Sequence, residues 1–198
     1  MVSKPTQLTL GGDLLVKKGE EAYNTEHDMV YPVDKEDLLT FDGKLDVSSI
    51  KNQIQSLKDD FDNNNNNTSN EITTKDVKSE FIAELTVPEG LELPKDLKAT
   101  LTENKLFEVK AGDVKRDGNK IIVKMTLKNE NYTKFIDLYT DVTSVPYKLD
   151  LEISNIKVKD TANGNLTVNG KVTGTFTGVA TTKDLKTKVF NYKWTATQ

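Results

Sequence analysis

The chain has 198 residues, a net charge of -4 and no cysteine. A chain of this length can bury a sizeable core without disulfides, and the lack of cysteine excludes cysteine-based catalysis. No apolar run approaches the roughly 18 residues that a membrane-spanning helix needs, and no basic block indicates a nucleic-acid partner. Residues 1–5 lack the apolar stretch of a secretory signal, so we interpret the chain as a fragment of a longer protein.

The first third of the chain predicts short strands followed by a helix. Apolar residues alternate with polar ones in four stretches, at 8–10, 14–16, 29–33 and 39–47. The period then changes to that of an amphipathic helix, with a stripe formed by Ile50, Ile54, Leu57 and Phe61. Asp46 or Ser48 can cap the start of this helix, because both side chains accept hydrogen bonds from backbone N–H groups.

A polar tract follows the helix and includes Asn63 to Asn67 in a row. It has no apolar periodicity, which indicates a loop. We favour a single domain over residues 1–198, because the segment before the loop holds few large apolar side chains. The alternative division has three parts: an N-terminal β/helical segment (1–60), an Asn-rich loop (61–77) and a sandwich (78–198).

The later two-thirds of the chain alternates with period 2, the pattern of half-buried strands. The predicted strands are 81–87, 97–101, 121–127, 147–153, 166–180 and 190–194. A second short helix is predicted around residues 132–142, where apolar side chains share one face. These elements predict a mainly β fold, an immunoglobulin-like antiparallel β-sandwich with one or two inserted short helices.

Two of these strands carry further signals. The apolar face of the strand at 166–180 includes Gly170, Gly174 and Gly178. Glycines at such positions indicate a bulge or the close approach of another chain segment. A turn near residues 182–184 should join this strand to the last one as a long hairpin. In the strand at 147–153, the alternation places Tyr147 in the buried phase.

The chain shows no catalytic constellation, so we predict a protein that is not an enzyme. Its single histidine, His27, sits among acidic residues, and no glycine-flanked nucleophile motif accompanies it. We interpret this region as a solvated acidic loop. A glycosidase would need two carboxylates facing each other across a cleft, and the sequence picks no such pair from its 31 acidic residues.

Calcium binding is the metal hypothesis that the sequence supports best. The candidate ligands are Asp60, Asp62, Asn64 and Glu71. They land on positions 1, 3, 5 and 12 of an EF-hand loop, a helix precedes them, and their oxygen atoms suit calcium. However, Asn65 replaces the glycine expected at position 6, and the segment that follows has the pattern of a strand. A chance match in a low-complexity tract therefore stays open as the alternative.

The last strand carries three aromatic residues on one face, Phe190, Tyr192 and Trp194. Flat rings stack on sugars, so Tyr192 and Trp194 are candidate ligand-binding residues. The partner strand offers Gly174 and Gly178 on the matching face, and large rings normally supply buried area. We therefore favour a place in the core for this aromatic face over a sugar-binding role.

Three segments carry a family resemblance. They are residues 79–91, the strand at 97–101, and the ending that runs from 170–176 to Tyr192-Lys193-Trp194. Over roughly the last 120 residues, the chain resembles the β-sandwich repeat modules of Gram-positive cell-wall-anchored surface proteins, the adhesins. Only Arg116 among the 27 basic residues is arginine, and asparagine is abundant, which indicates an AT-rich genome such as that of a low-GC Gram-positive bacterium.

The resemblance implies a non-catalytic, extracellular module of a cell-wall-anchored protein that binds a host protein or glycan and uses no cofactor. A stalk or spacer repeat without a ligand of its own is the first alternative. An accessory domain of a secreted hydrolase is the second. The expected partners are a host protein or glycan and the neighbouring modules of the same chain, with no nucleic acid and no membrane insertion.

The resemblance also brings the hypothesis of an intramolecular Lys–Asn isopeptide bond, which many modules of this kind carry. Lys17 or Lys18 near the start and Asn191 near the end have the right residue types. Such a bond needs both side chains inside an apolar core. Asn191 lies opposite in phase to Phe190 and Tyr192 and should point outward, so a chain without the bond stays the alternative.

Overall fold

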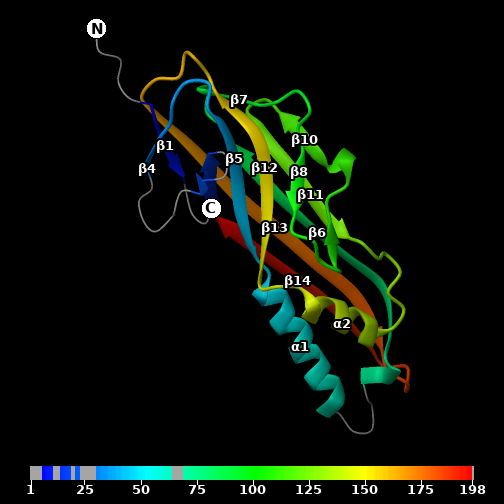
Figure 1. The fold of residues 1–198 in the computed structure, drawn as a ribbon. Coiled ribbons are helices and arrows are strands. Elements are labelled where there is room, and N and C mark those ends of the chain that lie inside the picture. Colours follow the sequence, from blue (N-terminus) through cyan, green and yellow to red (C-terminus); the bar gives the residue numbers. More distant parts are fainter. Residues whose placement is uncertain (1–5, 11–13, 19–20, 23–29, 64–68, 198) are drawn as a thin grey trace.

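A computed structural model of the chain describes residues 6–10, 14–18, 21–22, 30–63 and 69–197. In these residues it forms two β-sheets and two α-helices (Figure 1). The predicted fold class, a mainly β antiparallel sandwich with inserted short helices, is therefore confirmed. No described helix is both long and apolar enough to cross a membrane.

The larger sheet has eight strands in the order β10-β11-β6-β13-β1-β4, with β14 paired to β13 and β9 paired to β11. Its strands are β1 (Gln7–Leu10), β4 (Val30–Pro32), β6 (Thr73–Thr86), β9 (Phe107–Glu108), β10 (Val114–Asp117), β11 (Lys120–Leu127), β13 (Asn165–Thr181) and β14 (Thr187–Thr197). Its described pairs are antiparallel except β1 with β13, which run parallel. The start of the chain thus joins the sheet beside its longest strand.

The second sheet has six strands in the order β3-β2-β5-β12-β7, with β8 also paired to β12. Its strands are β2 (Leu14–Lys18), β3 (Glu21–Ala22), β5 (Leu38–Asp46), β7 (Leu91–Glu92), β8 (Ala99–Leu101) and β12 (Lys148–Val158). The predicted strand at 97–101 is thus shortened to three residues.

The two helices follow the predicted stripes and lie together at one end of the sandwich (Figure 1). They are α1 (Ser48–Asn63) and α2 (Phe135–Ser144). The Ser48 amide donates a hydrogen bond of 2.9 Å to the Asp46 carboxylate, so Asp46 caps α1 as predicted. Hydrogen bonds from Ser48 lower the pKa of Asp46. Phe61 of α1 meets Phe135 of α2 edge to face, with ring centroids 5.2 Å apart.

Strand β13 confirms both explanations of its glycines. A Cβ atom on Gly178 would lie 2.3 Å from Cζ of Phe190, so the ring of Phe190 occupies the space that a side chain would need. The register between β13 and β6 also shifts between Thr177 and Val179, which is a β-bulge. The predicted hairpin is present, because β13 pairs with β14 antiparallel from Lys171–Thr197 to Thr181–Thr187.

The buried apolar side chains form one cluster that draws on both sheets and both helices. Tyr147 is an exception to its predicted phase, because 61% of it is exposed. It precedes β12, and its ring lies under the Lys51 ammonium, 4.5 Å from the ring centroid. The buried phase of this strand therefore begins two residues later than predicted, at Leu149.

Regular structure reaches into both ends of the predicted Asn-rich loop (61–77). Helix α1 ends at Asn63 and β6 begins at Thr73, with a short 3-10 helix at Ser69–Glu71 between them. The single domain over residues 1–198 stays a prediction.

Candidate functional site

A groove of about 530 Å³ lies against the face of the larger sheet that points away from the second sheet. We call it the outer groove. Strands β6, β11 and β13 and the residues after β11 line it. Its polar lining residues are Lys78, Ser79, Glu80, Thr126, Glu130, Asn131, Thr175 and Thr177. They belong to four separate stretches of sequence, which only the folded sheet brings together.

The strand register sets the spacing of these side chains. Glu80 lies between Thr126 on β11 and Thr175 on β13, as the directly opposed residue of each. Cross-strand neighbours on one face have Cβ atoms about 5 Å apart, so the three side chains form a row. The Asn131 amide donates a hydrogen bond of 2.9 Å to the Asn129 side chain, which turns the chain after β11 and brings Asn131 to the groove.

The hydrogen-bonding groups of the outer groove are only partly used. The hydroxyl of Thr126 is buried and has no hydrogen-bond partner among the described residues. Glu80 lies 3.4 Å from the Lys124 ammonium, and Glu130 lies 3.6 Å from that of Lys110. A ligand that carries both donors and acceptors could pair with the exposed hydroxyl of Thr175 and with the free lone pairs of the carboxylates.

The outer face of the second sheet carries a lattice of ion pairs that the sequence patterns above do not predict. Asp42 on β5 is its centre, with a side chain only 2% exposed. Lys44 lies 3.4 Å from Asp42 and also pairs with Asp150. Lys17 lies 3.8 Å from Asp42 and 2.6 Å from Glu152. Opposite charges at alternate positions of β5 and β12 are the sequence signal that could have revealed this lattice.

Burial has the largest influence on the pKa of Asp42. It raises the pKa of this carboxyl, the neighbouring Asp150 adds to the rise, and Lys44 and Lys17 oppose it. The hydrogen bond to Glu152 raises the pKa of Lys17, and the one to Asp150 raises that of Lys44. One oxygen of Asp42 has no partner within the described part of the chain. The folded chain therefore favours the neutral form of Asp42 more than the unfolded chain does.

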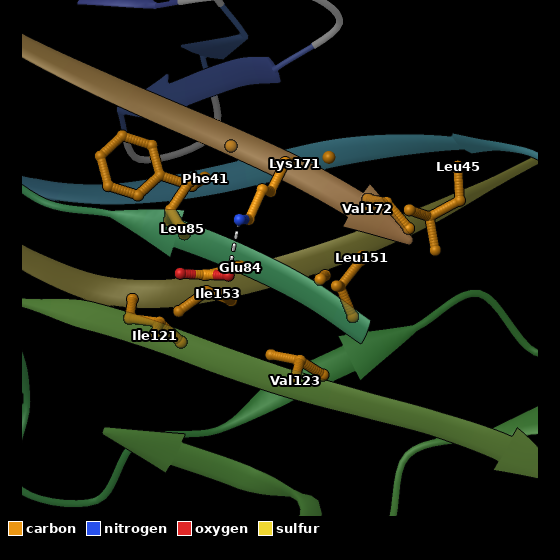
Figure 2. A pocket seen from close by; sticks show the side chains of 13 residues that line it. Phe41, Leu45, Glu84, Leu85, Ile121, Val123, Leu151, Ile153, Lys171 and Val172 are labelled. Atoms are coloured by element: carbon orange, nitrogen blue, oxygen red, sulfur yellow. Dashed lines mark ion pairs between the residues drawn. The ribbon is translucent and has the colours of Figure 1, made fainter. Parts of the chain in front are cut away.

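A second hollow lies between the two sheets and is apolar (Figure 2). Phe41, Leu45, Leu151 and Ile153 face it from the second sheet. Leu85, Ile121, Val123 and Val172 face it from the larger one. Its volume is about 40 Å³, room for little more than one water, and it has few polar groups to hold one. We regard it as a packing gap in the core.

The aromatic face of β14 is at least partly in the core, as favoured above. Phe190 is buried and Tyr192 is half-buried, with their ring centroids 5.8 Å apart. Burial raises the pKa of Tyr192, and the charge of Asp60 adds to the rise. Trp194 lies opposite Gly174 in the strand register, and its side chain lies outside the described residues. A binding role for Tyr192 and Trp194 stays a prediction.

The candidate calcium ligands Asp60, Asp62 and Glu71 each have a lysine nearby. Lys188 lies 3.4 Å from Asp60, Lys58 lies 2.6 Å from Asp62, and Lys183 lies 3.7 Å from Glu71. The fourth candidate, Asn64, lies outside the described residues, as does His27 with its acidic neighbours Glu20, Glu26 and Asp28. Among the described residues, no three acidic, histidine or cysteine side chains gather as a metal site. Calcium binding stays a prediction, which a titration calorimetry experiment checks.

The isopeptide candidates are not brought together. Lys17 and Lys18 lie on β2 of the second sheet, and carboxylates engage both: Glu152 lies 2.6 Å from Lys17, and Asp37 lies 3.1 Å from Lys18. Asn191 is exposed on β14 of the larger sheet, opposite Thr177. The bond itself stays a prediction, and an intact mass lower by one ammonia would reveal it.

Comparisons with known proteins give no family for this chain. No family model matches it, and no curated protein matches it. Among solved structures, the major pilin subunit of Bacillus cereus is similar over 98% of this chain and 69% of that chain, with 10% identical residues and a TM-score of 0.27. A likeness at this level does not show a shared role.

Proposed function

We propose that this chain is a non-catalytic module of a bacterial surface protein and that it binds a host protein or glycan through the outer groove. The observation that carries the proposal is the lining of this groove. Hydroxyls, an amide and two carboxylates converge on about 530 Å³ of space, and adjacent strands hold most of them at fixed spacing. The resemblance of residues 79–91 and 170–176 to surface adhesins supports the bacterial setting.

The exposed hydroxyl of Thr175 supports a ligand with hydrogen-bonding groups. A ligand group that pairs with this hydroxyl replaces the water that it otherwise binds. Sugar hydroxyls and peptide amides both offer the necessary donors. The carboxylates of Glu80 and Glu130 can accept further hydrogen bonds from the same ligand.

The test is a screen of glycans and host proteins against the whole chain, repeated with two variants. Thr175→Val removes an exposed hydroxyl of the groove and keeps the shape of the side chain. Thr167→Val is the matched control, because Thr167 is an exposed threonine on β13 outside the groove. We expect a ligand whose affinity falls about tenfold in Thr175→Val and is unchanged in Thr167→Val. A screen without any ligand, or equal effects of the two variants, would contradict the proposal.

A spacer is the second candidate, favoured by the ion pairs on the outer faces. Glu84 lies 2.8 Å from the Lys120 ammonium and 3.4 Å from that of Lys171, so it links three adjacent strands of the larger sheet. Lys17 and Glu152 join non-neighbouring parts of the sequence on the other sheet in the same way. Such polar, cross-linked faces suit a stiff repeat. The same screen separates the two candidates, because a spacer has no ligand of its own.

A further inference from the structure

Strand β14 has only one described partner along its whole length. Its 11 residues, Thr187–Thr197, pair with β13 from one end to the other. On its other side, no described strand pairs with it. An unpaired side of a strand presents a row of backbone N–H and C=O groups, which is a template for another strand.

The other outer strands of the two sheets are short. Strand β10 has four residues, three of them charged, and β4 has three residues and ends at Pro32. Strands β3 and β7 have two residues each, and β8 has three. Shortness, charge and proline are the devices by which proteins keep sheet edges from pairing. Strand β14 is long and has no proline, and its charge is limited to two lysines among 11 residues, so its edge is less protected than the others.

Helix α1 lies beside β14 without sealing its edge. A space of about 230 Å³ separates them, bounded by Gln53 and Asp60 of α1 and by Lys188 and Tyr192 of β14. The polar contact across it is an ion pair of 3.4 Å between Asp60 and Lys188. The carboxamide oxygen of Gln53 is buried there without a described partner. Among the described residues, α1 therefore contacts β14 through side chains and does not pair with its backbone edge.

We propose that β14 pairs with β14 of a second copy of this chain, antiparallel and centred on Asn191, to form one continuous sheet across a two-fold axis. A two-fold interface uses the same surface on both copies, and the two unpaired edges are equal in length and chemistry. This pairing is independent of ligand binding in the outer groove.

The side chains of β14 suit this register. Centring on Asn191 places Val189 opposite Lys193 and Phe190 opposite Tyr192. The alkyl stem of Lys193 would cover Val189, which is 72% exposed in the single chain. The aromatic pair would extend the ring cluster across the axis. No lysine faces another lysine, although β14 carries Lys188 and Lys193 and no acid.

Cysteine cross-linking tests the register directly, because the chain has no cysteine of its own. Asn191→Cys places one thiol on each side of the two-fold axis. Thr173→Cys is the control, since Thr173 is exposed on β13, one strand away from the edge. We expect the Asn191→Cys chain to form a disulfide-linked dimer at least about tenfold faster than the control under mild oxidation. Equal rates would overturn the proposal.

Sedimentation analysis of the whole chain gives the second readout. We expect a concentration-dependent dimer that Asn191→Lys weakens about tenfold, because two lysines would then face each other at the axis. Asn191 is exposed, so the fold should survive this change, and circular dichroism checks that it does. A chain that stays monomeric at every concentration would overturn the proposal. The free edge of β14 would then be available only to a strand of another protein. An Asn191→Lys chain that dimerises like the original would overturn the proposal too.

Discussion

The contact between Gly178 and Phe190 shows how one residue decides the packing of the long hairpin. An added Cβ at Gly178 would meet three atoms of the Phe190 ring within 3.0 Å. We predict that Gly178→Ala lowers the free energy of unfolding by about 1–3 kcal/mol, the usual cost of overpacking a core. Urea denaturation measures it. Gly112→Ala is the matched control, because a Cβ there meets nothing within 4 Å. Equal urea midpoints for Gly178→Ala and Gly112→Ala would contradict the close contact between Gly178 and Phe190.

Asp42 predicts a pH dependence of stability. Because burial raises its pKa in the folded chain, the native state holds the proton more tightly than the unfolded chain does. The free energy of unfolding contributed by Asp42 therefore rises as the pH falls through the folded pKa, until the ordinary value of 3.8 is passed. We predict that Asp42→Asn is more stable than the original chain at neutral pH and that this difference shrinks at acid pH.

Denaturation of both chains across this pH range checks the prediction. Asp96→Asn serves as the control, because the Asp96 side chain is 82% exposed. A stability difference for Asp42→Asn that does not change with pH would show that the lattice does not disfavour the charged form of Asp42.

At the same scale, the sequence predicts which face a side chain lies on better than it predicts its surroundings. The phase of Phe190 and Asn191 is correct because side chains alternate strictly along a strand. The burial of Asp42 follows from neighbours on β2 and β12, which a period-2 pattern does not identify. The same holds for Thr126, whose row with Glu80 and Thr175 depends on the register of three strands.

At the scale of elements, the gap between the sheets predicts a stabilising change. Ala83 on β6 lines this apolar hollow of about 40 Å³. We predict that Ala83→Val fills it and raises the free energy of unfolding by about 1 kcal/mol, from roughly 24 cal/mol per Å³ of cavity. Thermal unfolding of the two chains measures the change. Ala111→Val, at an exposed position, is the control. A loss of stability in Ala83→Val alone would mean that the added methyl groups do not enter the gap.

Most of the long strands and both helices were predictable, because each carries its own periodicity over many residues. Strand β13 and helix α1 are examples, with apolar residues in the expected phase except Val179 beside the bulge of β13. Strand β6 is an exception, because it begins at Thr73 and only its second half was predicted. The two-residue strands β3, β7 and β9 are too short to show a period. The parallel pairing of β1 with β13 joins residues about 160 positions apart, and only the assembled sheet determines it.

At the scale of the molecule, the outer groove and the β14 edge belong to the same sheet and do not overlap. Thr175 and Thr177 of β13 line the groove, and β14 lies on the opposite side of β13 from β6. A second copy paired through β14 would therefore extend the sheet and leave the groove open. Because the proposed axis is perpendicular to the sheet, both grooves would face the same side. Two sites on one side would strengthen attachment to a surface that carries many copies of a ligand.

The location of a bound ligand tests the proposed function most directly. Amide chemical shifts of the whole chain, followed by nuclear magnetic resonance while the best glycan or host protein from the screen is added, map this location residue by residue. We predict that the largest shifts fall on Glu80, Thr126 and Thr175, where the three strands line the outer groove. Shifts confined to other surfaces of the sandwich, or no shift with any ligand, would contradict it.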